Sequence, residues 1–410
     1  MSGRTVAVVG LGTMGRDIAY VHLVAGWRVV AVESSQERLA AAVATTRGHF
    51  TRRVERAEMQ SSAMDAALAR LVPTLDYAAL AGAELVIEAV VEQQPVKQEV
   101  FRLANRMVGR DAMLASNTST IPIRSLAAVV DAPERVLGLH FFSPARVMKL
   151  VEVVRSDATA PAVVDRAVAH VTSLGKVPVV VGDCYGFVSN RLSMAYHSEA
   201  IVLLEEGASP AEVDAPLVAF GMPMGPLTMS DLAGTDISYL AHDGLHAAYG
   251  DRAHASRLGE LMYERGRHGQ KAGRGYYRYA PNARGGAPDP ELEPLLDEAR
   301  RARGGAARRP SPDEILERVL LVTVNEGARC IEEEIAARAA DVDTIMRLGF
   351  GFPAAQGGLM EWAGREVGWA RVAEKLRAWG ADRPSTRYVP ARWIVARAGG
   401  AGGAGGAGGA

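Results

Sequence analysis

A glycine pattern near the start of the chain is compatible with few folds. The run VAVVGLGTMG places Gly10, Gly12 and Gly15 between an apolar β-branched segment and the helix-like segment TMGRDIAYVHLVAG. In a strand–turn–helix unit, the first glycine permits a tight turn, the second lets a pyrophosphate approach the backbone, and the third lets helix and strand pack closely. The helix N-terminus then presents unpaired amides to the phosphates. The pattern predicts a dinucleotide-binding βαβ unit, although a glycine-rich turn alone is a weak signal.

An acidic residue at the right distance favours a dinucleotide-binding loop over a glycine-rich turn that binds no ligand. Glu33 follows the second apolar run, RVVAV (28–32), about twenty residues after the glycines, where a carboxylate accepts hydrogen bonds from the adenosine ribose. No arginine follows it immediately in the stretch ESSQ, so a 2′-phosphate would be poorly accommodated. We therefore expect NAD rather than NADP as the cofactor.

Short β-branched runs alternate with Ala-, Leu- and Arg-rich segments up to about residue 182. This alternation predicts a Rossmann-type, doubly wound α/β domain over residues 1–185. A stretch without a strand pattern, residues 37–71, should project from the sheet as a helical excursion. The expected strands are residues 5–9, 28–32, 85–90, 113–117, 136–142, 150–154 and 177–181.

The remainder of the chain is helical in pattern and contains an internal duplication. The segment from SNRLSMAYHSEA to DLAG is echoed by the segment from LERVLLVTVNEG to EWAG. In this alignment Glu199 matches Glu326 and Asp214 matches Asp341 without a gap, and DLAG (231–234) matches EWAG (361–364) after a three-residue insertion. We expect two tandem all-α domains, at 186–280 and 312–397, joined by a surface connector at 281–311 that contains a short acidic helix. A disordered Gly/Ala tail should follow at 398–410.

Bulk properties exclude several classes of function. Basic and acidic residues balance, 46 against 47, so a nucleic-acid-binding surface is not expected. No apolar stretch approaches the 18 residues of a membrane span, and no secretory signal precedes the first strand. The two cysteines, Cys184 and Cys330, lack metal-type spacing and fit a reduced compartment. We expect a cytoplasmic protein without a metal, nucleic-acid or membrane partner.

Two polar residues interrupt the apolar stretch GLHFFSPARVMKLVEVV. His140 ends one expected strand and Glu152 lies in the next, so a strand–loop–strand arrangement can bring the two side chains together. A carboxylate on one imidazole nitrogen fixes the tautomer and stabilises the imidazolium, which leaves the other nitrogen as a base. In a hydride-transfer site that base removes the hydroxyl proton. A structural, buried His–Glu pair is the alternative on this pattern alone.

Two further polar residues follow expected strands. Ser119 lies in ASNTST and Asn190 in GFVSNR, and strand C-termini are where open α/β sheets bind ligands. Each side chain could hydrogen-bond a substrate oxygen. A turn serine and a helix-starting asparagine are more commonly capping residues, which is the structural alternative.

Taken together, several long motifs resemble the L-3-hydroxyacyl-CoA dehydrogenase family. They are, in order, GLGTMG, VIEAVVEQQPVKQEVF, LASNTSTIPI, GLHFFSPARVMKLVEVV, GFVSNR, GMPMGP and GQKAGRGYYRY. The similarity runs from about residue 5 to 280, and the duplicated part extends it to about 380. The tandem helical domains look most like the dehydrogenase portion of multifunctional fatty-acid oxidation enzymes, here without the hydratase half.

The resemblance implies a role for each matching residue. It makes His140 the general base and Glu152 its orienting carboxylate, and it places Ser119 and Asn190 at the substrate. At the position of Ser143 the family usually has an asparagine, which helps hold the cofactor and the substrate. With a serine here, the rate and the substrate specificity could differ. The cofactor-binding residues it implies are Gly10, Gly12, Met14, Gly15, Glu33, Val90, Glu92, Lys97, Ser119 and Ser143.

Arginines in the helical excursion form a candidate substrate clamp. Arg52 and Arg56 are four residues apart and share a helix face, which is also consistent with a solvated surface helix. Because the family's helical hairpin contacts acyl-CoA and phosphates favour arginine forks, we expect these arginines to bind the CoA phosphates.

The implied activity is the reversible NAD-dependent oxidation of an L-3-hydroxyacyl-CoA to the 3-oxoacyl-CoA. The alternatives are a dehydrogenase of a carrier-bound or free 3-hydroxy acid, and a catalytically silent NAD-binding subunit. In the second helical copy Glu317 takes the position of Asn190, so we expect one active site per chain. The second copy would cover the surface through which single-copy relatives dimerise, which predicts a monomer or weak homodimer.

Overall fold

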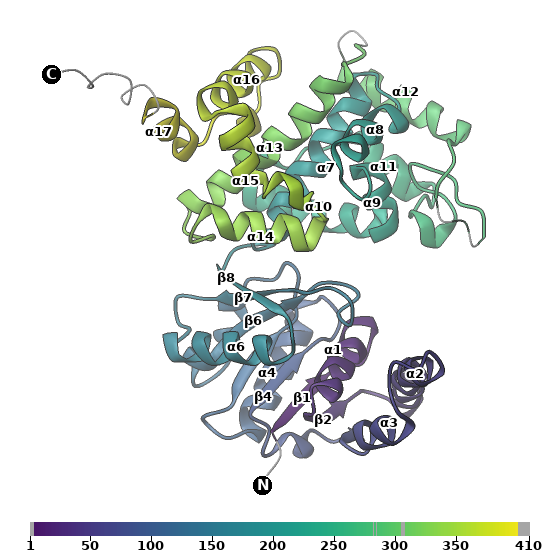
Figure 1. Ribbon diagram of the computed structural model, residues 1–410, viewed down its shortest axis with the longest axis vertical. Helices are drawn as coiled ribbons and strands as arrows, with labels where there is room; N and C mark the ends of the chain where they lie inside the picture. Colours follow the sequence, from purple (N-terminus) through teal and green to yellow (C-terminus); the bar gives the residue numbers. More distant parts are fainter. Residues whose placement is uncertain (1–3, 282, 284, 305–307, 401–410) are drawn as a thin grey trace, which may run out of the picture. The chain divides into compact units, whose positions relative to one another are not determined.

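The computed structural model describes residues 4–281, 283, 285–304 and 308–400. They form two compact units, divided between Phe187 and Val188, close to the boundary predicted at 185 and 186. Each unit is considered by itself (Figure 1).

An eight-stranded sheet organises the first unit, with strand order β3-β2-β1-β4-β5-β6-β7-β8. All neighbouring strands are parallel except β6 and β7, which are antiparallel. Successive strands are added on one side of β1 up to β3 and on its other side from β4 onwards. Doubly wound sheets bind their ligands at this switch point between β1 and β4. The strands are β1 (Thr5–Val9), β2 (Arg28–Val32), β3 (Leu71–Thr74), β4 (Leu85–Glu88), β5 (Met113–Ser116), β6 (Val136–Phe141), β7 (Leu150–Arg155) and β8 (Val177–Gly182).

The seven predicted strands are present, whereas β3 was not predicted. It is four residues long, and Pro73 interrupts its β-branched pattern. A proline lacks the amide needed inside a sheet, but β3 pairs only with β2 at the edge, where proline is tolerated.

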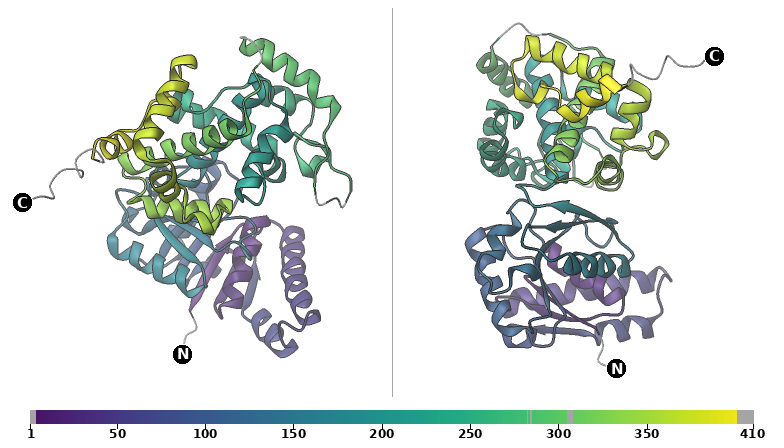
Figure 2. Two further views of the ribbon diagram at one scale, coloured as in Figure 1. Left: turned by 45° about the horizontal axis from the view of Figure 1, so that its top comes forward. Right: turned by 90° about the vertical axis from the view of Figure 1, so that its left-hand side faces the viewer.

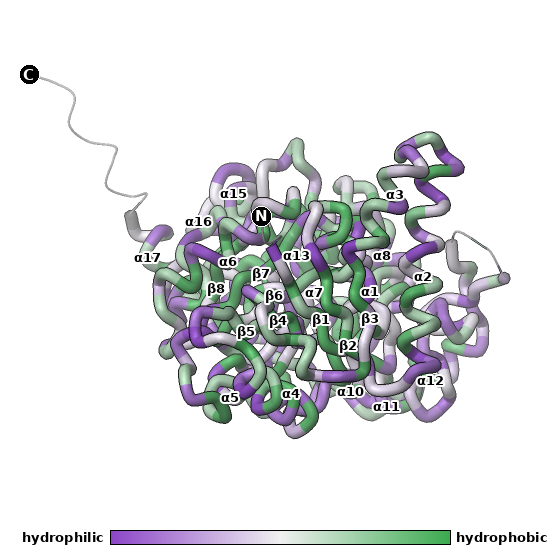
Figure 3. The backbone as a smooth tube through the Cα atoms, turned by 90° about the horizontal axis from the view of Figure 1, so that it is seen from below, coloured by the Kyte–Doolittle hydropathy of each residue, from purple (hydrophilic) through white to green (hydrophobic). Residues whose placement is uncertain are grey.

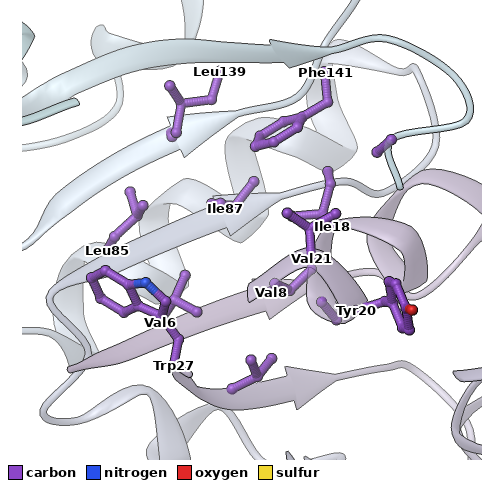
Figure 4. Close-up of a cluster of buried hydrophobic side chains, with 14 of the residues drawn as sticks. Val6, Val8, Ile18, Tyr20, Val21, Trp27, Leu85, Ile87, Leu139 and Phe141 are labelled. Atoms are coloured by element: carbon purple, nitrogen blue, oxygen red, sulfur yellow. The ribbon is translucent and has the colours of Figure 1, made fainter. Parts of the chain in front are cut away.

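Helices cover both faces of this sheet. On one face α1 (Thr13–Val24) and α6 (Pro161–Ser173) pack on a core that includes Val8, Ile87 and Phe141 (Figure 4). On the other, α4 (Gln94–Met107) and α5 (Ile123–Ala127) contact each other and the sheet. Strands in the middle of this unit are coloured mostly as hydrophobic in Figure 3, as expected for a sheet buried on both faces. Short 3-10 turns lie at η1 (Tyr77–Leu80) and η2 (Pro133–Arg135).

The predicted helical excursion consists of α2 (Gln36–Glu55) and α3 (Ser61–Leu68), which lie beside the sheet (Figure 2). The long α2 is anchored rather than free, because Phe50 is fully buried and its ring centroid lies 4.6 Å from that of Tyr20 in α1. The end of α2 is therefore held at a defined position beside α1.

The second unit contains the helices of both copies. The first copy contributes α7 (Ser189–Glu206), α8 (Pro210–Phe220), α9 (Pro226–Ala233), α10 (Thr235–Tyr249), η3 (Gly250–Arg252), α11 (Arg257–Glu264) and η4 (Gln270–Ala272). The turn η5 (Pro290–Leu292) and α12 (Glu293–Arg303) follow. The second copy contributes α13 (Pro312–Glu332), α14 (Ala339–Phe350), η6 (Ala354–Gln356), α15 (Leu359–Trp362), the π-helical turn η7 (Ala363–Val367), α16 (Trp369–Asp382), η8 (Thr386–Tyr388) and α17 (Arg392–Gly400). None of the helices in the described part of the chain has the length and apolar character of a membrane span.

Reciprocal ion pairs join the two copies across α7 and α13. One buried arginine of each helix binds two glutamates of the other, in equivalent positions. Arg191 lies 2.8 Å from Glu326 (Nε to Oε1) and 2.5 Å from Glu333 (Nη1 to Oε2), and Arg318 lies 2.7 Å from Glu199 (Nε to Oε1) and 2.6 Å from Glu206 (Nη1 to Oε2).

The turns after α8 and α14 repeat this reciprocity. Gly221 and Gly351 end these helices with φ of 113° and 74°. A Cβ on Gly221 would lie 2.9 Å from Cγ of Pro353, and one on Gly351 would lie 2.7 Å from Cγ of Pro223. The two copies are thus related by a local pseudo-two-fold axis.

The structure corrects part of the sequence alignment of the copies. Asp214 accepts a hydrogen bond from the amide of Leu227 at 2.9 Å, and its structural equivalent is Asp343, which accepts one from Met360 at 2.6 Å. The aligned Asp341 instead pairs with Arg338 at 3.1 Å. The turn between α13 and α14 is longer than its counterpart, and an ungapped alignment misses this insertion.

The match of DLAG with EWAG is also wrong. Gly234, with φ of 105° and ψ of 114°, precedes α10, and its equivalent before α16 is Gly368, with φ of 84° and ψ of 134°. The π-helical turn η7 adds to the shift, because it holds extra backbone within one helical segment.

The predicted surface connector contains a packed helix. Leu296 of α12 is fully buried, and Nε of Arg300 donates to the carbonyl of Leu204 at 3.1 Å. At the other end of the unit, α17 runs to Gly400, into the region predicted as tail. Residues 401–410 lie outside the described residues.

Candidate active site

His140 and Glu152 are direct cross-strand partners in the antiparallel pair β6–β7. Nδ1 of His140 lies 2.8 Å from Oε2 of Glu152, and both side chains are buried. The rings of Phe142 and Phe187 lie 4.9 and 5.8 Å from the imidazole, centroid to centroid. The carboxylate thus sets the orientation of the imidazole inside an aromatic surrounding, and Nε2 is the ring nitrogen that Glu152 does not engage.

The strand order brings the predicted residues of the first unit to one edge of the sheet. Strands β1, β2, β4, β5 and β6 run in parallel, so their C-terminal ends share that edge. Gly10, Glu33, Val90 and Ser119 follow the first four of these strands, and His140 lies near the end of β6. Met14, in the first turn of α1, and Ser143, exposed in the loop after β6, belong to the same edge.

The glycine-rich loop fits a dinucleotide. A Cβ on Gly12 would meet no atom within 4 Å, so the backbone there is open to a phosphate group. A Cβ on Gly15 would lie 1.8 Å from the carbonyl oxygen of Gly10, and one on Gly10 would lie 2.8 Å from Cγ1 of Val90. Gly12 therefore leaves room for a phosphate to approach the backbone, and Gly10 and Gly15 permit close packing, as their spacing predicts.

Glu33 is held at the glycine loop as a carboxylate. Its Oε2 accepts from the amide of Leu11 at 2.9 Å, and its Oε1 accepts from the amide of Ser34 at 2.7 Å. Burial opposes ionisation, but these hydrogen bonds and the nearby guanidinium of Arg38 outweigh it and lower the pKa of Glu33. The ionised group can accept hydrogen bonds from a ribose.

Lys97 and Glu92 form a network after β4. Nζ of Lys97, fully buried, lies 2.8 Å from Oε1 of Glu88 and 3.1 Å from Oε2 of Glu92. Glu92 also accepts from the hydroxyl of Thr118 at 2.5 Å and from the amide of Ser119 at 2.8 Å. Burial opposes its ionisation, but the Lys97 charge and these donors hold the pKa of Glu92 below its usual range. Sequence analysis missed Glu88, which reads as one more residue of an apolar strand.

Asn190 lies in the second unit, in the first turn of α7, and is partly buried. Its equivalent in the second copy, Glu317, pairs with Lys375 of α16 at 2.5 Å. The second copy thus uses this position for an ion pair of its own. Among the described residues, no group of three or more His, Cys, Asp or Glu side chains is arranged to hold a metal ion.

A basic cavity of about 590 Å³ lies in the first unit, and we call it the basic pocket. Arg52 and Arg56, the predicted clamp, both line it. Burial, followed by the charges of Arg146 and Arg52, lowers the pKa of His49 in its wall. The lining also includes Arg53, the neighbour of Arg52 on α2, and three cations from distant segments that were not predicted, Arg146, Lys149 and Lys176. Glu58 is the carboxylate in the lining.

This arrangement defines a class of protein. A doubly wound sheet with a dinucleotide loop, and a His–carboxylate pair at the same edge, is the layout of a nicotinamide-dependent dehydrogenase.

Comparison with known proteins identifies the family. The model of the 3-hydroxyacyl-CoA dehydrogenase NAD-binding domain matches residues 5–184, and that of the C-terminal domain matches residues 186–279 and 315–410. The chain belongs to the 3-hydroxyacyl-CoA dehydrogenase family, and its cofactor is NAD. The two matches of the C-terminal model agree with the internal duplication.

Relatives and solved structures agree with this assignment. The chain is 36% identical to a peroxisomal fatty acid beta-oxidation multifunctional protein of Oryza sativa subsp. japonica over 92% of its length and 52% of the relative's. The human peroxisomal bifunctional enzyme is 37% identical over 93% of this chain and 54% of its own length. The structure of 3-hydroxybutyryl-CoA dehydrogenase from Escherichia coli K12 matches with a TM-score of 0.86 at 29% identity, covering 97% of this chain and 98% of that one. The chain spans about half the length of these curated relatives.

Proposed function

We propose that the protein catalyses the reversible NAD-dependent oxidation of an L-3-hydroxyacyl-CoA to the 3-oxoacyl-CoA in fatty-acid or related acyl-CoA metabolism. The observation that carries this proposal is the 2.8 Å contact between His140 and Glu152 at the cofactor edge of the sheet. A silent NAD-binding subunit would not need this pair, so an imidazole with its orienting carboxylate at this position supports the proposal of an enzyme.

The chain's own residues account for the proton in this reaction. NAD, when bound, supplies the acceptor for the hydride that leaves C3 of the substrate. Nε2 of His140 takes the proton of the C3 hydroxyl, and Glu152 on Nδ1 stabilises the imidazolium that results. Ser119 and Asn190 are proposed to hydrogen-bond the substrate oxygens, and in the reverse direction His140 returns its proton.

The activity is tested by following NADH formation with 3-hydroxyacyl-CoA substrates of increasing chain length, a carrier-bound analogue and a free 3-hydroxy acid. We expect turnover of the CoA thioesters and a loss of at least about a hundredfold in kcat for His140→Gln, with NAD affinity unchanged. A His140→Gln enzyme that remains fully active would contradict the assignment of His140 as the general base. Exclusive turnover of the carrier-bound analogue or the free acid would establish one of the alternatives.

The basic pocket favours CoA over an acid without phosphates. Six lysine and arginine side chains face one carboxylate in its lining, and its volume is that of a small-molecule site. CoA carries three phosphate groups, and arginine forks bind phosphate oxygens in pairs. We therefore place the phosphates of the substrate at this pocket.

Substitution of the two predicted clamp residues tests this placement. Arg52→Glu combined with Arg56→Glu should raise KM for a CoA thioester about tenfold or more and hardly affect a pantetheine thioester, which lacks the distal phosphates. Arg47→Glu, an exposed arginine of the same helix outside the pocket lining, is the matched control. Equal losses on both substrates would assign the arginines another role.

We also propose a cytoplasmic location, because the sequence has only two cysteines, Cys184 and Cys330, far apart and without metal-type spacing, which suits a reduced compartment. The rice and human relatives are peroxisomal by name. Fractionation of the source cells against a marker for each compartment decides between the two.

A further inference from the structure

Lys176 ties down the turn that connects the two catalytic strands. Its side chain is buried at 8% exposure, and Nζ donates to the carbonyls of Ala145 and Met148, each at 2.5 Å. Both carbonyls belong to a single turn, closed by hydrogen bonds from the amides of Val147 and Met148 to the carbonyl of Pro144, at 2.9 and 3.0 Å. One ammonium group therefore bridges the turn over residues 144–148.

This turn fixes where the catalytic strands end. It lies in the loop between β6, which carries His140, and β7, which carries Glu152. Directly after Lys176, the amide of Val177 donates to the carbonyl of Lys149 at 2.8 Å, so the same segment also holds the start of β7. A displacement of the turn would disturb the adjoining ends of β6 and β7, close to the pair in which His140 and Glu152 meet.

The residue that holds this turn also lines the basic pocket. Lys176 is part of the pocket lining, next to Lys149, whose Nζ lies 3.4 Å from the carbonyl of Gly175. Burial, followed by the charge of Lys149, lowers the pKa of Lys176 to about 8. Within the described part of the chain, no carboxylate forms an ion pair with Lys176. The charge of Asp17 opposes this lowering of the pKa, and a phosphate in the pocket would add a further counter-charge to the ammonium.

We propose that Lys176 is a positioning residue that couples occupancy of the basic pocket by a phosphate to the geometry of the His140–Glu152 pair. The ligand chemistry rests on the proposed function, in which the phosphates are those of CoA. Binding of the distal part of the substrate then stabilises the charged ammonium, the turn at 144–148 and the catalytic register. Interactions with remote parts of a substrate can in this way raise kcat as well as lower KM.

A divided substrate tests the coupling. The reduction of acetoacetyl-pantetheine by NADH is measured with and without adenosine 3′,5′-bisphosphate, which supplies two of the three CoA phosphates as a separate molecule. For the unmodified protein we expect the bisphosphate to raise kcat at least threefold. In Lys176→Met the activation should be absent, and kcat with acetoacetyl-CoA should fall about tenfold, with NAD affinity unchanged.

Two further variants separate positioning from pocket charge. Lys149→Met removes a cation from the same pocket without loss of a bond to the turn, so activation should persist but require more bisphosphate. Lys176→Arg keeps a charged donor and should retain part of the activation, which also covers the case in which Lys176→Met does not fold.

The outcomes distinguish this inference from the proposed function. If the unmodified protein turns over acetoacetyl-CoA but gains no rate from the bisphosphate, or if Lys176→Met is activated equally, the coupling is wrong and the proposed function stands. If neither thioester is turned over, the proposed function itself fails.

Discussion

At the scale of single residues, the cofactor preference depends on more than Glu33. Nε of Arg38, in the first turn of α2, lies 3.6 Å from Oε1 of Glu33. The prediction of NAD rests on the residues directly after Glu33, whereas this arginine lies a few residues further on, in the first turn of α2. In the structure Glu33 engages this arginine, which could otherwise approach a 2′-phosphate.

Replacement of Glu33 tests this relation. Glu33→Ala should weaken NAD more than NADP, because it removes an acceptor for the ribose hydroxyls and a charge that repels the 2′-phosphate. We expect the ratio of kcat/KM with NAD to kcat/KM with NADP to fall about tenfold or more. A tenfold change corresponds to about 1.4 kcal/mol of differential interaction free energy. In the double variant, Glu33→Ala with Arg38→Ala, kcat/KM with NADP should rise less than in Glu33→Ala alone. An unchanged ratio in the single variant would show that Glu33 is not at the ribose.

At the scale of elements, α7 and α13 are joined by charged side chains that, apart from the exposed Glu333, are almost fully buried. Glu206 binds Arg318 and also Arg383, whose Nε lies 2.5 Å from its Oε1. Burial opposes ionisation of this carboxyl, but hydrogen bonds from the two arginines outweigh it and lower the pKa of Glu206 from 4.5 to about 2. Because the folded pKa lies below the unfolded one, this stabilisation is complete above about pH 4.5 and is lost as the pH falls towards 2.

Glu206→Gln should therefore be most destabilising near neutral pH. We expect the free energy of unfolding to fall by about 3 kcal/mol at pH 7, and the difference from the unmodified protein to shrink between pH 5 and 3. Urea unfolding followed by tryptophan fluorescence measures it, since four of the five tryptophans lie in the second unit. Glu374→Gln, an exposed position on α16, serves as the control. A difference that does not change with pH would contradict the assigned cause.

At the scale of the whole chain, the second copy supplies packing rather than a second site. Glu317 pairs with Lys375, and the reciprocal contacts of α7 with α13 cover surfaces that one copy alone would expose. Most such contacts in other oligomers join two identical subunits around a two-fold axis. Here they lie within one chain.

Removal of residues 311–410 should expose those surfaces of α7 and α8. We expect the full chain to be a monomer or a weak homodimer with one NAD site, and the truncated chain to dimerise or aggregate, as measured by sedimentation velocity and NAD titration. A tight full-length dimer through residues 190–280, together with a soluble monomeric truncation, would refute this interpretation.

Local patterns were sufficient for much of the fold and part of the site. The spacing of Gly10, Gly12 and Gly15, the alternation of β-branched and helical runs, and the short distance between His140 and Glu152 all depend on residues close in sequence. Neighbouring segments obey steric and periodic rules that a sequence displays directly. The glycine loop, seven strands and the buried His–Glu contact follow from those rules.

Other features were decided by packing between distant segments. The edge strand β3, the equivalence of Asp214 with Asp343, and the buried face of α12 depend on partners that no local pattern reveals. The basic pocket shows this most clearly, because α2, the loop after β6 and Lys176 are far apart along the chain and meet only when the sheet is assembled. A charged residue on an isolated segment looks like ordinary surface, and its role emerges only from the groups that folding places beside it.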